Sequence, residues 1–110
     1  MPESRMNELA QNLLGQSKED KIDWESTGAR ASYRVIFPDV VLTISRVCLD
    51  IGETSDLRLE LMNETGRVIN LLETAPEDSM HSLLEQIFDL AERHVRDAGI
   101  DKALEYLKRS

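Results

Sequence analysis

The residues whose types and spacing could form a chemical site lie in the C-terminal third of the chain. His81, Glu85 and Asp89 follow one another at intervals of four residues, and Glu92 comes three residues later. Side chains three and four residues apart share one face of a helix, where a metal ion or an acid–base pair could be assembled. Asp89 and Glu92 each precede an arginine by four residues, an order that favours ion pairs on a solvated helix. We therefore interpret the row as a solvated face and a candidate partner-binding surface, rather than a metal or catalytic site.

Three arginines form a second candidate group. Arg34, Arg46 and Arg58 fall in segments with strand-like alternation, so they could gather on one face of a sheet and bind an anion. The sequence does not fix the register between these strands. We retain Arg34 and Arg58 as candidate partner-binding residues.

Motifs of catalysis and cofactor binding are missing from the sequence. It contains no G-x-S-x-G, G-x-x-x-x-G-K, G-x-G-x-x-G, H-E-x-x-H or C-x-x-C pattern. Two histidines and one cysteine do not supply the usual ligand set of a structural zinc site. We expect a protein that is not an enzyme and has no cofactor.

Charge restricts the class of partner. The chain carries 13 basic and 21 acidic residues, a formal charge of −8. Nucleic acid and anionic membrane surfaces would be repelled, so neither is an expected partner. An encounter guided by charge would require a basic surface on a protein partner, although the same charge could serve solubility alone.

The compartment follows from the cysteine count and from hydropathy. Cys48 is the only cysteine, so no disulfide can form within the chain. The longest aliphatic run, Val40 to Leu42, is far too short to cross a bilayer. We expect a cytoplasmic protein without a membrane-spanning segment.

Hydrophobic periodicity predicts the elements that carry these residues. Apolar residues at helical spacing predict a helix over 4–18, and a period of two then predicts strands over 21–25, 32–37, 40–47, 57–61 and 68–72, with Trp24 facing inward. A polar loop over 50–56 separates the third and fourth of these strands. Thr74, followed three residues later by Glu77, matches a capping box and predicts the start of a long helix. Gly99 is a typical C-terminal stop, and Asp101 could cap a short final helix with Ala103, Leu104 and Leu107 facing inward.

These elements predict one α+β domain over residues 1–110. Four to five strands form an antiparallel meander, and the C-terminal helices pack on one sheet face. The second face would be half apolar, because it carries a polar centre and an apolar surround: Arg34, Thr43, Ser45, Arg58, Glu60 and Asn70 with Ile36, Val41, Met62, Val68 and Leu72. Either the first helix or a second copy of the protein could cover it, and the second alternative is a homodimer through this face.

Several segments together resemble a diffuse group of short bacterial proteins of unknown function. The resemblance is carried by a K-x-x-W-E strand at Lys21 to Glu25, an N-x-x-G turn at Asn63 to Gly66, and the Leu-rich helix from Leu83 to Arg93. It covers most of the chain and implies the same order of elements and a bacterial cytoplasmic setting. It supplies no catalytic residue.

Two functions remain after these exclusions. The first is a small acidic interaction module, an adaptor or accessory subunit that works through its sheet face or its acidic helix. The second is an acidic inhibitor or chaperone for a basic partner, of the immunity, antitoxin or secretion-chaperone kind. The stretch from Glu73 to Glu92, with six acidic residues and no lysine or arginine, motivates the second. Secretion chaperones place a helix between their third and fourth strands, where this sequence predicts only the loop over 50–56.

Overall fold

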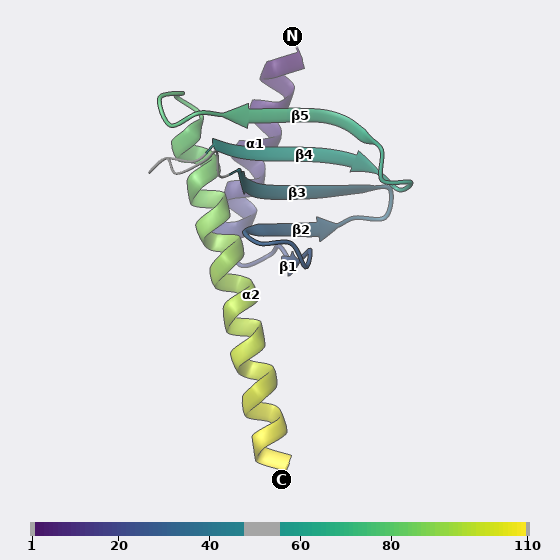
Figure 1. The fold of residues 1–110 in the computed structure, drawn as a ribbon, viewed down its shortest axis with the longest axis vertical. Helices are drawn as coiled ribbons and strands as arrows, with labels where there is room; N and C mark the ends of the chain where they lie inside the picture. The colour runs from purple at the N-terminus through teal and green to yellow at the C-terminus, as the bar shows by residue number, and fades with distance from the viewer. Residues whose placement is uncertain (1, 48–55, 110) are drawn as a thin grey trace.

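The α+β class is confirmed. The structure, a computed structural model, describes residues 2–47 and 56–109. The elements are α1 (Pro2–Lys18), β1 (Glu25–Ser26), β2 (Ser32–Ile36), β3 (Val40–Val47), β4 (Asp56–Asn63), β5 (Val68–Thr74) and α2 (His81–Arg109) (Figure 1). Of the strand predicted over 21–25, only Glu25 is in β1. Cys48 and nearly all of the predicted 50–56 loop lie outside the described residues.

The five strands form one antiparallel sheet in the order β1-β2-β3-β4-β5. Each strand pairs with the next one along the chain, as expected for strands joined by short turns. The register places side chains of successive strands opposite one another, so each strand contributes alternate residues to one face. Leu42, Ile44, Leu57 and Leu59 share one face and are at most 2% exposed.

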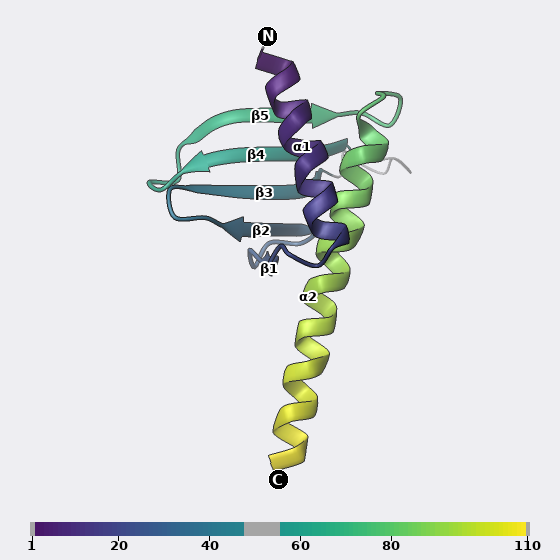
Figure 2. The same ribbon diagram turned by 180° about the vertical axis from the view of Figure 1, so that it is seen from behind.

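Both helices cover that same face of the sheet. Figure 2 shows α1 crossing in front of the strands with α2 beside it, and Figure 1 shows the sheet from its other side. The helices and the sheet share one core, to which α1 contributes Met6, Ala10, Leu13 and Leu14 and α2 contributes Leu84, Ile87, Phe88 and Ala91. Trp24 is 3% exposed, which confirms its predicted inward position, and its indole N–H donates to Ser17 Oγ at 3.1 Å.

A β-bulge in β5 changes which residues face the core. Leu61 lies opposite Asn70 and Met62 lies opposite Val68, so Ile69 is an extra residue in β5. Strict alternation predicted Asn70 and Leu72 on the second face, and this was wrong. The extra residue shifts the alternation by one, so Leu72 packs against the core. Leu71 lies on the second face and is 46% exposed.

The start of α2 also differs from the prediction. Thr74 is the last residue of β5, and α2 begins at His81. The capping box does not form, because Thr74 belongs to β5 and its side chain lies against His81. Ala75 N–H donates to Asp78 Oδ2 at 2.8 Å in a turn, and Thr74 Oγ1 lies 3.1 Å from Nδ1 of His81.

The predicted break at Gly99 does not occur, and α2 is one continuous helix to Arg109. Gly99 is not among the glycines with positive φ, which are Gly28 and Gly66 in the described residues. It therefore does not adopt the left-handed conformation of a glycine that ends a helix. The separate final helix starting at Asp101 was a wrong prediction for the same reason.

The second half of α2 leaves the body of the protein. All residues from Arg96 to Arg109, here called the projecting half, are exposed. Ile100 follows the buried Ala91 by nine residues, which is two and a half turns, so the two side chains lie on opposite sides of the helix. The predicted inward position of Ala103, Leu104 and Leu107 was therefore wrong. The projection makes the molecule elongated, with extents of 54 × 36 × 27 Å.

We predict that Gly99→Ala stabilises α2. A Cβ at this position would meet no atom within 4 Å, and alanine favours the helix interior over glycine by about 0.8–1 kcal/mol. The helical signal in far-UV circular dichroism should rise and persist to higher temperature. Gly66→Ala is the matched control, because Gly66 has φ +87° and the same substitution there should destabilise by about 1–2 kcal/mol. A loss of helical signal in Gly99→Ala would show that the helix ends there.

Candidate functional site

The second face of the sheet is not covered by any described helix. We call it the open face, and it is turned toward the viewer in Figure 1. The register aligns Ile36, Val41, Met62 and Val68 across β2, β3, β4 and β5, and these four residues form an apolar band. Ile36 is 58% exposed and Val68 is 47% exposed. The first helix therefore does not cover this face, while the alternative of a homodimer through it stays a prediction.

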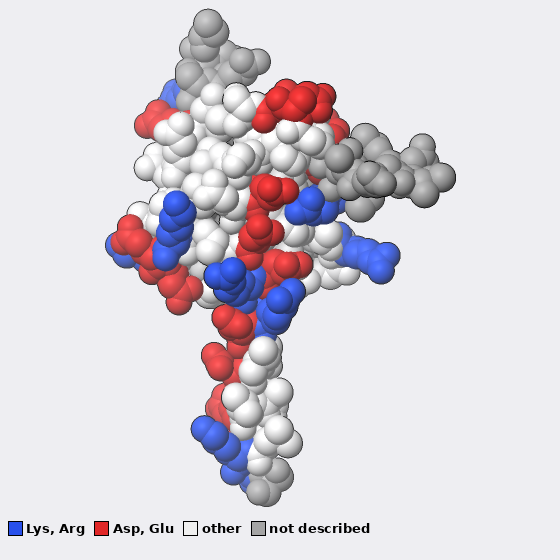
Figure 3. All heavy atoms as spheres, turned by 90° about the vertical axis from the view of Figure 1, so that its left-hand side faces the viewer, with Lys and Arg blue, Asp and Glu red and all other residues white. Residues whose placement is uncertain are grey.

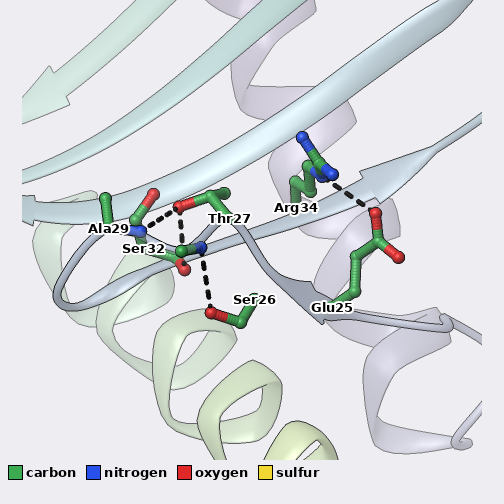
Figure 4. A network of polar contacts seen from close by, with 7 residues as sticks. Glu25, Ser26, Thr27, Ala29, Ser32 and Arg34 are labelled. Atoms are coloured by element: carbon green, nitrogen blue, oxygen red, sulfur yellow. Dashed lines mark hydrogen bonds and ion pairs between the residues drawn. The ribbon is translucent and has the colours of Figure 1, made fainter.

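The charged residues of the open face are paired with one another. Arg34 Nε donates to Glu25 Oε1 at 2.8 Å, between directly opposed residues of β1 and β2 (Figure 4). Arg58 donates to Glu73 Oε2 at 2.7 and 2.9 Å in the same way between β4 and β5. The hydrogen bond to Glu73 raises the pKa of Arg58. Two of the candidate residues thus have their charges balanced within the face.

The predicted grouping of three arginines was wrong. Arg46 pairs in register with the buried Leu57 and lies on the core face, where its Cζ is 4.7 Å from the centroid of the Phe88 ring. Successive strand residues point to opposite faces, and Arg46 is an even number of residues from Ile44 and Leu42. Arg34 and Arg58 share the open face, and each is paired with a glutamate.

A shallow hollow of about 340 Å³ lies on the open face beside the apolar band. Thr43, Arg34, Val41 and Met62 contribute to its lining. Thr43 Oγ1 is buried without a hydrogen-bond partner among the described residues. At the end of the hollow, Thr27 Oγ1 accepts from Ala29 N–H at 3.1 Å and Ser26 Oγ accepts from Gly28 N–H at 3.1 Å, contacts that hold the turn after β1 (Figure 4). Both apolar and polar side chains therefore line the hollow.

Of the predicted row on α2, only the acidic residues lie on the surface of the protein, and His81 is buried. His81 is 9% exposed, and its Nδ1 lies 3.1 Å from Oγ1 and 3.3 Å from the carbonyl oxygen of Thr74. It joins β5 to α2 and does not take part in the surface, contrary to the prediction. The burial has a simple cause, because His81 is three residues before Leu84 on the core-facing side of the helix.

The remaining members of the row form an acidic column, defined as Glu85, Asp89 and Glu92. Glu85 and Asp89 are exposed, and Glu92 is half-buried and lies 3.4 Å from Arg96 Nη2. Figure 3 shows acidic side chains following one another down α2. Within residues 2–47 and 56–109, no three or more His, Cys, Asp or Glu side chains are placed so that they could hold a metal ion. The acidic column is therefore a row of regularly spaced negative charges along one side of α2.

His94, which the sequence suggests only as a partly buried packing residue at the edge of the apolar stripe, links α2 to the segment after α1. Nδ1 of His94 lies 3.1 Å from Asp20 Oδ1, and Nε2 lies 3.2 Å from Asp23 Oδ1. Both ring nitrogens can donate at once only when the imidazole is protonated. Partial burial lowers the pKa of His94, but the hydrogen bonds and charges of Asp23 and Asp20 outweigh it and raise the pKa above 6.5. The contact joins residues more than 70 positions apart, which no local pattern reveals.

The comparisons with known proteins give no family. No family model matches the chain, and no curated protein or solved structure matches it either. The resemblance to short bacterial proteins therefore stays a prediction. Neither helix of the described part has the length of apolar sequence that a bilayer crossing requires.

We predict that the contribution of His94 to stability depends on pH. A histidine whose pKa is raised by folding stabilises the protein fully below its unfolded pKa, near 6.5, and this stabilisation is lost as the pH rises through the folded pKa. In urea unfolding, wild type should exceed His94→Gln in free energy of unfolding by more at about pH 5.5 than at about pH 8.5. NMR titration provides the direct measurement, and Asp20→Asn and Asp23→Asn should each lower the pKa of His94. A pKa at or below 6.5 in the wild type would contradict the contact.

Proposed function

We propose that this protein is a non-catalytic interaction module, an adaptor or accessory subunit, whose open face docks a partner protein. The apolar band carries the proposal. Single exposed apolar residues are normal on a protein surface, but a contiguous apolar row across four strands is typical of a contact surface. Leu71, next to the band and 46% exposed, extends it.

The surroundings of the band support docking. A protein interface commonly has an apolar centre and a polar rim. The ion pairs Arg34–Glu25 and Arg58–Glu73 lie beside the band, and their side chains remain about 40–50% exposed. Because they are already paired, a partner could leave them at the rim without providing counter-charges.

The charge distribution favours a basic partner, which supports an inhibitor or chaperone as the second candidate function. Glu85 and Asp89 have no ion-pair partner among the described residues. Regularly spaced acidic groups on an exposed helix attract a basic surface and speed its encounter. The proposed setting of either function is the cytoplasm.

We predict that docking is lost when charge enters the apolar band. The protein is immobilised on a resin and incubated with a lysate of its source organism. It should retain a partner protein, which quantitative mass spectrometry identifies. Ile36→Glu with Val68→Glu should weaken retention by at least about tenfold, because burying each new carboxylate costs more than 1.4 kcal/mol. Tyr106→Glu is the matched control, since Tyr106 is 67% exposed and lies far along α2 from the sheet.

Two outcomes would contradict the first proposal. One is that micromolar protein retains no partner, and the other is that the double variant retains the partner as well as the wild type does.

The dependence of binding on salt concentration separates the second candidate function from the first. Binding to a basic partner should weaken as ionic strength rises from about 0.05 to 0.5 M, because the screening length shortens. If binding does not change with ionic strength, the second candidate function, in which charge attracts a basic partner, is excluded, and docking through the apolar band is the explanation that fits.

A further inference from the structure

The projecting half of α2 carries an apolar face of its own. Ile100, Leu104 and Leu107 lie at spacings of four and three residues, which places them in one stripe along the helix. They are 52%, 48% and 70% exposed. In Figure 3, charged side chains follow one side of the projecting helix and uncharged side chains the other. An amphipathic helix of this kind requires a second apolar surface to bury its stripe.

The described body of the same chain does not supply that surface. The stripe lies half a turn away from the buried side of α2, as the nine-residue step from Ala91 to Ile100 requires. The helix is continuous through this region, so it holds the stripe away from the core. The occupant must come from another molecule.

The molecule that covers the stripe could be a different, basic protein or a second copy of this chain, and the distribution of charge distinguishes these two. Residues 96–109 contain four of the 13 basic residues and three of the 21 acidic residues, whereas the rest of the chain has nine and 18. A basic protein would be drawn to the body and the acidic column, since the projecting half carries a net charge of +1. The projecting half of a second copy also carries charges of both signs, so the electrostatic repulsion between the two projecting halves is small.

The order of these charges fits an antiparallel pair. Asp101 and Lys108 are seven residues apart and therefore lie on the same flank of the stripe. When two identical helices run antiparallel about a two-fold axis, the same flanks face each other, so each Asp101 lies near the other copy's Lys108. No ion pair involves either residue within the described part of the chain. An antiparallel arrangement also places the two acidic bodies at opposite ends of the pair, whereas a parallel one would bring them together.

We propose that a second copy of this chain docks on the projecting half of α2, with the Ile100, Leu104 and Leu107 stripes of the two copies packed antiparallel. The proposal is independent of the function proposed above, because it uses a different surface. The overlap of 14 residues spans about 21 Å, so the dimer is small and forms at high micromolar concentration.

Sedimentation velocity over a concentration series tests the stripe. Wild type should shift reversibly from monomer to dimer, and Leu104→Glu should weaken the dimer by about a hundredfold, because the symmetric contact loses both leucines at roughly tenfold each. Tyr106→Glu adds the same charge to the same helix outside the stripe and should leave the dimer unchanged. Circular dichroism confirms that both variants remain folded.

Charge exchange tests the orientation. Asp101→Lys and Lys108→Asp should each weaken the dimer by about threefold to tenfold, and the double variant should restore it, because only an antiparallel pair brings these two positions together. A wild type that stays monomeric at millimolar concentration would overturn the proposal. So would a dimer that tolerates Leu104→Glu but is lost in Ile36→Glu with Val68→Glu, which would place the contact on the open face. Failure of the double variant to restore the dimer would overturn the antiparallel arrangement.

Discussion

The packing of both helices on one face of the sheet is the constraint from which the other features follow. Leu42, Ile44, Leu57 and Leu59 of the central strands are buried beneath α1 and α2. A sheet of five strands has two faces, and the helices of the described part of the chain pack on only one of them. The hydrophobic contribution of the core, about 25 cal/mol per Å² of apolar surface buried, therefore comes from one side. No helix within residues 2–47 and 56–109 covers the opposite face.

The same packing determines where α2 can go. The first half of the helix is fixed by Leu84, Ile87, Phe88 and Ala91, and His81 joins its start to the end of β5. From Arg96 to Arg109 every residue of α2 is exposed, so no buried contact holds this part of the helix against the sheet. The apolar residues resume half a turn away, on the side that faces solvent. Two surfaces with different charge result, an acidic body with an apolar sheet face and a nearly neutral amphipathic helix.

Features with a regular local period could be predicted from the sequence. Alternation identified β2, β3 and β4, helical spacing identified α1 and α2, and the position of Trp24 followed from its alternation with Ile22. Features that depend on one irregular residue or on distant partners could not. The bulge at Ile69 reverses the faces of Leu71 and Leu72, and a run of apolar residues gives no sign of it. The same holds for His81 and His94, whose positions follow from tertiary contacts.

The predicted helix break at Gly99 shows how a local signal can mislead. Glycine is frequent just after helices, but it is also tolerated within them at a cost of about 1 kcal/mol. Treating residues 81–109 as one helix would have placed Ile100 opposite Ala91 and separated the two apolar stripes. The candidate residues Arg34 and Arg58 were correctly assigned to one face, yet their glutamate partners depend on the strand register.

The one-sided core is tested most directly by comparing two leucines in adjacent strands. Leu59 is fully buried against the helices, whereas Leu71 lies on the open face and is 46% exposed. In urea unfolding at low protein concentration, Leu59→Ala should lower the free energy of unfolding by about 2–5 kcal/mol, and Leu71→Ala by less than about 1 kcal/mol. Equal losses for the two variants, or a larger loss for Leu71→Ala, would contradict the account.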